Sequence, residues 1–242
     1  MRDDVTDPPS MRVVGPGRAG SSLGLALQRT GWRVVQPVRH GEPLADAARG
    51  VDLLVLAVPD ASIASTARAI EPVSGTVVAH LAGSLGLDVL APHPRRGALH
   101  PLVALPDAEV GARRLRDGVW FAIAGDPLVS RVVEDLDGRS FTVADEHRAA
   151  YHAAAVIASN HVVALLGQAE RVAGVAGVPL EAYLELVRAT IDNVAELGPA
   201  AALTGPAARG DWDTIGRHLE ALPESERDAY EAMVRLARRL VD

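Results

Sequence analysis

The stretch that decides the fold is Val13 to Gly24, "VVGPGRAGSSLG". Its glycines at 15, 17 and 20 have the spacing G-x-G-x-x-G, which is a weak signal when it stands alone. Here an apolar run, 11–15, leads directly into the glycines, and a helical pattern that closes at Gly31 follows them. A strand that enters a helix through three such glycines is the first unit of a dinucleotide-binding fold.

Alternating strand and helix patterns continue through the first half of the chain. The run "VDLLVLAV", 51–58, is almost wholly apolar, as expected for a strand that is buried on both faces of a parallel sheet. A helix is expected over 61–70. Further strands are expected at 33–38, 75–81, 97–100, 119–124 and 140–143. This order predicts an α/β fold, with a disordered tail at 1–10 and a doubly wound Rossmann domain at 11–144.

Strand patterns stop at Asp145, and the rest of the chain, 145–242, is expected to form an all-helical domain for substrate binding and dimerisation. Asp145 is expected to cap a helix that runs to about residue 174. Further helices are expected over 179–197, 211–222 and 223–241, with Asp211 as a cap, and the Gly- and Pro-rich segment 198–213 interrupts them. The uncharged run 149–169 is long enough to cross a membrane. Its polar residues, which include His152 and Asn160, favour a buried central helix instead.

Composition excludes several classes of protein and of chemistry. The net charge of −7 argues against nucleic-acid binding. The chain has no cysteine, which excludes disulfides and thiolate nucleophiles and favours a cytoplasmic location, and the start of the chain lacks the apolar segment of a signal peptide. All 24 basic residues are arginines, so no reaction can depend on a lysine.

The glycine stretch predicts a bound dinucleotide. Gly15 allows the tight turn, Gly17 lets backbone amides approach the pyrophosphate, and Gly20 lets helix and strand pack closely. The second strand ends in Arg39 and His40 without an acidic residue, which favours NADP(H), because an arginine suits the 2′-phosphate; the alternative is that Arg39 is a solvated loop residue. Contacts with the cofactor are expected from Gly15, Gly17, Arg18, Ala19, Gly20, Arg39, His40, Val58, Pro59 and Ser84. Ser84 could instead be a helix N-cap.

Several longer segments resemble one known family. They are "GPGRAGSSLG" (15–24), "AVPD" (57–60), "HLAGSLGLDVL" (80–90), "LHPL" (99–102), "YHAAAVIASNHVVALL" (151–166) and "TIDNVAELGPAAALTGPAARGD" (190–211). They resemble the family that combines a Rossmann-like domain with the domain of unknown function 2520, within the 6-phosphogluconate-dehydrogenase-like superfamily. The resemblance implies a homodimer that is built by the helical domain.

More distant similarities concern particular reactions. "LHPL" and "IASNHVVAL" are similar to segments of prephenate dehydrogenases, but Asn160 stands where that family has its catalytic histidine. The same helix resembles the substrate helix of pyrroline-5-carboxylate reductases. Hydroxyacid dehydrogenases and ketopantoate reductases rely on a lysine that this chain lacks. Neither the prephenate nor the lysine-dependent activities can therefore be carried over.

The candidate catalytic residues are His100, Ser159 and Asn160. His100 follows a predicted strand, at the edge of the sheet where such folds bind ligands, so it could be a general acid, orient a carbonyl or imine, or be structural. Ser159 and Asn160 are polar residues within an apolar helix and could bind substrate or nicotinamide, or join two helices. Asn193, Thr204 and Arg209 are candidate substrate ligands, although Arg209 could equally pair with Asp211. The histidines at 147, 152 and 161 do not share a helix face, so no metal site is expected.

Together these features predict an NADP(H)-dependent oxidoreductase that transfers a hydride to or from a small carbonyl, imine or hydroxy compound, because the cofactor carries the reactive hydride and asks the protein only for positioning and a proton. The alternative is a non-catalytic NADP(H)-binding sensor or scaffold. A deazaflavin-linked reductase is a further possibility.

Overall fold

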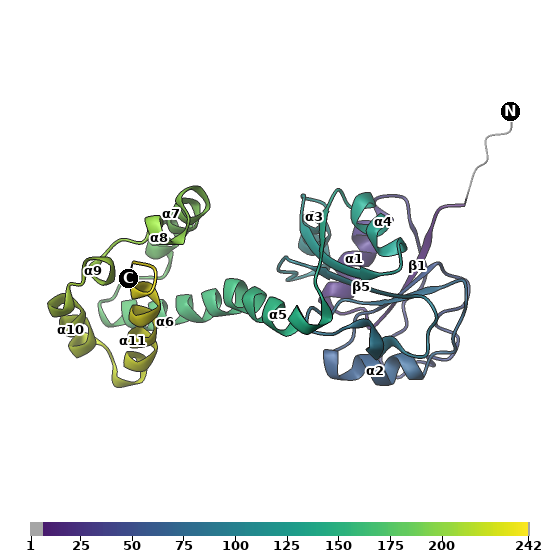
Figure 1. Ribbon diagram of the computed structural model, residues 1–242, viewed down its shortest axis with the longest axis horizontal. Coiled ribbons are helices and arrows are strands. Elements are labelled where there is room, and N and C mark those ends of the chain that lie inside the picture. The colour runs from purple at the N-terminus through teal and green to yellow at the C-terminus, as the bar shows by residue number, and fades with distance from the viewer. Residues whose placement is uncertain (1–6, 242) are drawn as a thin grey trace, which may run out of the picture. The chain divides into compact units, whose positions relative to one another are not determined.

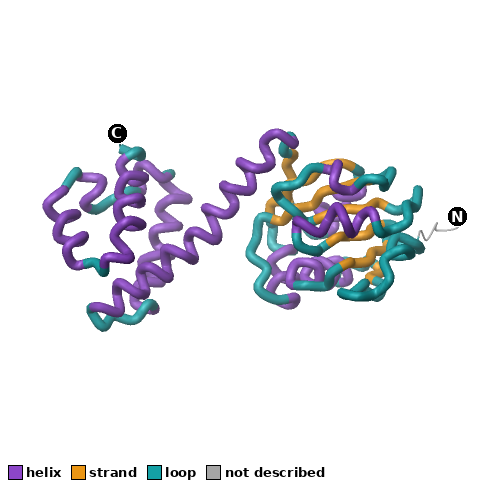
Figure 2. Tube along the Cα trace, turned by 90° about the horizontal axis from the view of Figure 1, so that it is seen from below, coloured by secondary structure: helices purple, strands orange, loops and turns teal. Residues whose placement is uncertain are grey.

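The computed structural model describes residues 7–241, and they form two compact units, one that extends to Ile157 and one from Ala158 onward. All the strands of the described chain belong to the first unit, and the second is built from helices and loops (Figure 2). The α/β class and the order of a Rossmann-like part before a helical part are therefore confirmed. The boundary between the units lies within a helix, 13 residues beyond the expected position at 144.

The first unit contains a seven-stranded sheet with the order β2-β1-β3-β4-β5-β6-β7. The strands are β1 (Ser10–Val14), β2 (Arg33–Val34), β3 (Leu53–Leu56), β4 (Val77–His80), β5 (Arg96–Pro101), β6 (Trp120–Gly125) and β7 (Arg139–Thr142). All neighbouring strands are parallel except β5 and β6, which are antiparallel. Because β2 lies on one side of β1 and β3 on the other, the chain reverses its direction of winding at β1, and ligands of such sheets bind at this point.

Helices cover both faces of the sheet (Figure 1). One face carries α1 (Arg18–Gln28), α3 (Ala108–Leu115) and α4 (Leu128–Asp135), and the other carries α2 (Asp60–Arg68) and the 3-10 turn η1 (Leu87–Leu90). In β3, Leu53 and Val55 pack into the apolar core under α1, α3 and α4, whereas Leu54 and Leu56 pack into the core under α2 and η1. The alternation of side chains along a strand thus explains why an uninterrupted apolar run was needed there.

Two details of the strands differ from expectation. The hydrogen-bonded part of β2 covers only Arg33–Val34, and Val38 forms a separate bridge with Val14, because Pro37 has no amide hydrogen for a continuous ladder. Ser10 belongs to β1 instead of the expected tail, since its amide and its hydroxyl both donate to Asp52, at 2.8 and 2.7 Å. Of the expected tail, residues 1–6 lie outside the described residues.

A single long helix, Asp145–Val175, runs from the end of the first unit into the second. It consists of the 3-10 turn η2 (Asp145–His147), α5 (Arg148–Val156), the π-helical turn η3 (Ile157–His161) and α6 (Val162–Val175). The remaining helices are α7 (Glu181–Leu197), α8 (Pro199–Ala202), α9 (Pro206–Arg209), α10 (Trp212–Ala221) and α11 (Glu224–Arg238). Asp211 caps α10, with its Oδ1 accepting from the Thr214 amide at 3.1 Å, as the sequence predicts.

The long helix does not have the buried environment that the sequence suggested. Its most apolar window is long and apolar enough for a membrane span, with a mean hydropathy of 1.4, but none of that window is buried. Asp145 does not cap it either: its carboxylate accepts a hydrogen bond from Arg148 Nε at 2.7 Å. The apolar side chains of this window are therefore left without a covering surface in the described chain.

Candidate functional site

The glycine loop between β1 and α1 is shaped by contacts that exclude side chains. Gly15 has a φ of +81°, and a Cβ there would lie 2.9 Å from the Ala57 carbonyl oxygen. A Cβ at Gly20 would lie 2.7 Å from Val13 Cγ1 and 2.8 Å from Ala57 Cβ. Gly15 is therefore needed for the turn, and Gly20 for the close approach of α1 to the sheet.

Gly17 differs from the other two glycines. It is the N-cap residue of α1, it provides no side-chain cap, and a Cβ there would meet no atom within 4 Å. The space above this helix end is thus open, and the first amides of an α-helix lack partners within the helix. Such a helix end attracts an anion.

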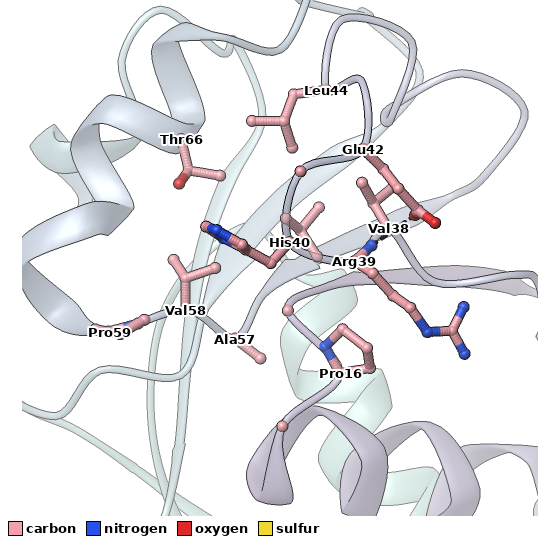
Figure 3. Close-up of a pocket in the computed structure, with 14 residues that line it drawn as sticks. Pro16, Val38, Arg39, His40, Glu42, Leu44, Ala57, Val58, Pro59 and Thr66 are labelled. Carbon is pink, nitrogen blue, oxygen red and sulfur yellow. Dashed lines mark hydrogen bonds between the residues drawn. The ribbon is translucent and has the colours of Figure 1, made fainter.

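A pocket of about 600 Å³ opens beside this loop, at the position where the winding of the sheet reverses (Figure 3). It is lined by the ends of β1 and β3 and by the loop after β2. The lining residues are Val14, Gly15, Pro16, Gly17, Val38, Arg39, His40, Gly41, Glu42, Leu44, Ala57, Val58, Pro59 and Thr66. Six of the expected cofactor contacts lie here: Gly15, Gly17, Arg39, His40, Val58 and Pro59. Arg18, Ala19 and Gly20 occupy the first turn of α1 and do not line the pocket.

The loop after β2 places the side chains of Arg39 and His40 at this pocket. The His40 imidazole points toward Val58 and Thr66, whereas the Arg39 side chain extends the opposite way, past Pro16 (Figure 3). Glu42 Oε2 accepts a hydrogen bond from the Arg39 backbone amide at 2.7 Å. Glu42, the nearest acidic residue after β2, therefore binds the backbone of the loop. The Arg39 guanidinium forms no ion pair with any described residue.

Beyond this pocket, polar residues continue along the same edge of the sheet, where parallel strands β3, β4 and β5 end. The Ser84 hydroxyl, after β4, donates to Asp60 Oδ2 at 3.0 Å, at the beginning of α2. The helix-cap alternative for Ser84 is therefore wrong, because the following turn η1 starts at Leu87 and has Gly86 as its N-cap.

His100 lies near the end of β5 and is bound to α5. Its Nδ1 is 2.6 Å from the Tyr151 hydroxyl oxygen, and its ring meets the His152 ring edge-on with the centroids 5.7 Å apart. Burial, with a smaller contribution from His152, lowers the pKa of His100 to about 4, and burial raises the pKa of Tyr151 to about 12. At neutral pH the hydrogen bond therefore joins an uncharged tyrosine hydroxyl to Nδ1 of a neutral imidazole.

The loop "HLAGSLG", 80–86, closes over these rings because of its glycines. A Cβ at Gly83 would lie 2.7 Å from His152 Nδ1 and 3.0 Å from His100 Nε2. A Cβ at Gly86 would lie 2.7 Å from Asp145 Oδ2. His80, fully buried, binds the Gly86 carbonyl oxygen through Nε2 and accepts from the Ala82 amide through Nδ1, and burial lowers its pKa.

The structure thus assembles residues that the sequence reasoning did not select: Arg148, Tyr151, His152, His80 and Asp60. A signal was available for three of them. Arg148, Tyr151 and His152 stand at i, i+3 and i+4, and therefore share one face of α5. The described residues contain no group of three His, Cys, Asp or Glu side chains that could hold a metal ion.

Ser159 and Asn160 lie in the π-helical turn η3, and both are exposed. The expectation that they are buried among apolar residues is therefore not met in the chain by itself. Turns of this type are rare, and they are frequent at functional sites because the extra residue changes which side chains face a ligand. Their catalytic role stays a prediction.

The candidate substrate ligands of the helical unit are dispersed over three elements. Asn193 lies on α7, Thr204 between α8 and α9, and Arg209 at the end of α9, and all three are exposed. Asp211 is engaged in capping α10 through both carboxylate oxygens, and the described residues contain no Arg209–Asp211 ion pair. The alternative of a buried pair is therefore wrong, and the role of Arg209 in substrate binding stays a prediction.

Comparison with family models agrees with this two-part organisation. Residues 37–106 match the Rossmann-like domain, and residues 120–237 match the domain of unknown function DUF2520. The chain therefore contains a Rossmann-like domain followed by a DUF2520 domain, as the resemblance of its sequence implies. The DUF2520 match begins at β6, so this domain includes the antiparallel end of the sheet as well as the helices.

Solved structures share the fold over nearly the whole chain. A Bacteroides fragilis protein, provisionally described as an NADP oxidoreductase, is 23% identical, with a TM-score of 0.83 over 96% of this chain and 99% of its own. A Thermotoga maritima protein is 24% identical, with a TM-score of 0.71 over 96% and 98%. The Plasmodium falciparum pyrroline carboxylate reductase, with NADP bound, is 13% identical, with a TM-score of 0.64 over 98% and 99%. No functionally curated protein matches the chain.

Proposed function

We propose that this DUF2520 family member is an NADP(H)-dependent oxidoreductase that transfers a hydride to or from a small carbonyl, imine or hydroxy compound. The observation that carries the proposal is the pocket of about 600 Å³ beside the glycine loop, at the reversal of strand order, with Arg39 and His40 in its wall. The NADP named in the description of the Bacteroides protein, and bound in the Plasmodium reductase, supports the same cofactor.

The residues of this pocket fit a dinucleotide. In the proposal, the pyrophosphate lies at Gly17 and the first turn of α1, where the space is open and Arg18 is exposed. The adenosine end occupies the pocket beside His40, and the Arg39 guanidinium, free of any carboxylate partner among the described residues, binds the 2′-phosphate. Glu42 does not select NAD in this arrangement, because it accepts a hydrogen bond from the Arg39 amide.

The polar residues at the ends of β4 and β5 are then proposed to serve the reaction. When bound, the cofactor supplies or accepts the hydride. With a pKa of about 4, His100 is not charged at neutral pH, so it does not deliver a proton as an imidazolium. In the proposal, the proton is on Nε2, the ring nitrogen that does not face Tyr151, and it orients a carbonyl or imine. Ser84, Ser159 and Asn160 are proposed to orient the nicotinamide or the substrate, and Asn193, Thr204 and Arg209 to bind substrate.

We further propose that the chain acts as a homodimer through its helical unit. Among the described residues 158–241, only Ala173, Ile215 and Leu222 are buried apolar side chains. Large apolar side chains on α6 and α7 are exposed instead, including Val163 at 69% and Leu186 at 64%. A unit with so small a core needs a covering surface, and a second copy supplies one of matching character.

The proposed activity is tested with purified full-length protein in two steps. NADPH and NADH are titrated first, and NADPH is expected to bind more tightly. NADPH oxidation is then followed with a panel of small keto acids, aldehydes and cyclic imines, and NADP⁺ reduction with the corresponding hydroxy acids and amines. Tight NADPH binding without turnover on any compound would favour the sensor or scaffold alternative. If neither nucleotide binds, the proposal is wrong.

A further inference from the structure

Arg148, at the beginning of α5, is buried in an unusual way. Only 1% of the residue is exposed, and it is among the largest fully buried side chains of the described chain. Its Nε donates to Asp145 Oδ1 at 2.7 Å, but Nη1 and Nη2 are both buried and have no hydrogen-bond partner in the part of the chain that the structure describes. Buried guanidinium nitrogens without partners are costly, because they have lost water without gaining a replacement.

The carboxylate next to Arg148 engages its Nε and leaves both Nη atoms unpartnered among the described residues. Among residues 7–241, Asp145 is its one ion-pair partner, and the Asp145 side chain is 64% exposed, so that pair is screened by water. His80 and His100 face the same region, and the Arg148 charge contributes to keeping both neutral. Asp60 acts on these histidines from the beginning of α2. The region therefore combines the Arg148 guanidinium with neutral histidine rings, and its acids are Asp145, on Nε of Arg148, and Asp60.

A second unsatisfied group lies on the same face of α5. His152 Nδ1 is buried and has no partner among the described residues, and its ring contacts both Gly83 and His100. Three buried nitrogens without partners thus belong to residues on one helix face, next to the imidazole that is proposed to orient the reacting group. The two Nη atoms of an arginine form the planar fork that matches both oxygens of a carboxylate.

We propose that Arg148, with His152, binds a carboxylate of the substrate, so that the reacting compound is a small oxo or imino acid, or its reduced hydroxy or amino acid, and not a neutral carbonyl compound. This inference rests on the proposed function, because it names the substrate class of that site. The carboxylate reaches the two Nη atoms through a local opening of the surrounding side chains, since neither atom is exposed. His100, in contact with His152, then lies on the side of the carbon that is reduced.

The test compares a charged probe with its neutral analogue on the full-length protein. Pyruvate and pyruvamide are titrated while the Nε–Hε signals of ¹⁵N-arginine-labelled protein are followed, with and without NADPH. Pyruvate is expected to bind at least tenfold more tightly than pyruvamide and to shift the Arg148 signal. Arg148→Gln removes this preference, whereas Arg116→Gln, at an exposed arginine of the same unit, preserves it.

The outcomes separate this inference from the proposed function. Equal affinity for the two probes, or an unchanged preference for pyruvate in folded Arg148→Gln, overturns the carboxylate site, even if NADPH binds. Failure of NADPH to bind, together with a retained preference for pyruvate, overturns the cofactor proposal alone. If Arg148→Gln does not fold, Arg148→Lys replaces it: this variant keeps the charge without the fork, and pyruvate is expected to bind about tenfold more weakly. The wild-type signal shift decides the question independently.

Discussion

Substitutions at Gly17 and Arg39 can test cofactor binding without changing the stability of the fold. Gly15 and Gly20 cannot be substituted without backbone strain or collision, so a loss of binding in those variants would be ambiguous. Gly17 has open space and an ordinary φ of −73°, and Arg39 is exposed. Substitutions at these two residues therefore change the ligand site while leaving the packing of the sheet intact.

Gly17→Val is expected to fold like the wild-type protein and to bind NADPH at least tenfold more weakly, because the added side chain occupies the place of the pyrophosphate. Fluorescence titration measures the binding, and thermal unfolding checks the fold. Gly75→Val is a matched control, since Gly75 has equally open space at the opposite edge of the sheet, before β4. Unchanged NADPH affinity in folded Gly17→Val would contradict the proposed position of the pyrophosphate.

Arg39→Gln is expected to weaken NADPH binding by about tenfold to a hundredfold, the usual range for a hydrogen bond to a charged group, and to leave NADH binding almost unchanged. Both dissociation constants are measured at one salt concentration, because the contact is electrostatic. Arg68→Gln, at an exposed arginine of α2, serves as control. Equal losses for the two nucleotides would show that Arg39 does not bind the 2′-phosphate.

His100 is expected to stay neutral well below pH 6.5, because its folded pKa is about 4. Between these values the unfolded chain takes up a proton that the folded chain does not. The free energy of unfolding should therefore fall as the pH decreases from about 6.5 toward 4, and this contribution is complete above pH 6.5. The decrease should be smaller in His100→Asn than in the wild type, with exposed His147→Asn as control. A His100 ring that titrates near pH 6.5 in NMR spectra would refute the burial argument.

At the scale of elements, glycines and a capping side chain set the ends of the short helices in the second unit. Glycines at 198, 205 and 210, all with positive φ, delimit the short helices α8 and α9 in the segment before Asp211. Asp211 then starts α10 through its side chain. These boundaries depend on contacts between near neighbours in the sequence, so single substitutions test them directly.

Asp211→Ala is expected to lower the free energy of unfolding by about 0.5–2 kcal/mol, the usual cost of removing an N-cap acceptor. Urea unfolding followed by circular dichroism measures the change. Asp213→Ala, in the first turn of the same helix, removes an acidic residue without removing the cap and should cost less. Equal losses in the two variants would mean that helix electrostatics, and not the cap, accounts for the effect.

At the scale of the whole molecule, the two units have unequal cores. The sheet unit contains two buried clusters, one on each face, whereas the described residues 158–241 bury three apolar side chains. The exposed apolar side chains of α6 and α7 are therefore the surface that we propose for the homodimer.

Light scattering over a dilution series is expected to give twice the mass of the 25.3 kDa chain, without detergent. Val163→Asp on α6 should shift the protein toward monomer, because it places a charge on the proposed interface. Leu102→Asp, at an exposed apolar residue of the sheet unit, should leave the mass unchanged. A monomer at all concentrations would contradict the homodimer, and a requirement for detergent would indicate that a membrane covers the helix instead.

The strands, most helices and the glycine loop could be predicted because each depends on a pattern within a few residues. The apolar run of β3 indicates burial on both faces, and the spacing of Gly15, Gly17 and Gly20 indicates a strand entering a helix. The interruption of the β2 ladder at Pro37 is also a local effect, because it depends on the missing amide hydrogen of that residue. The expected strand at 33–38 did not take it into account. Such signals need no knowledge of distant contacts, because side-chain periodicity and backbone sterics act along the chain.

The grouping around His100 could not be deduced in this way. Tyr151 and His152 come from a helix some 50 residues later in the chain, and Gly83 comes from the loop after a neighbouring strand. Their approach lowers the pKa of His100 to about 4, which changes its expected role from proton donor to orienting group. Burial is a property of packing between distant segments, and the free-energy cost of a buried charge appears only when that packing forms. For this reason the residue types could be read from the sequence, whereas their protonation and unpaired nitrogens depend on the tertiary structure.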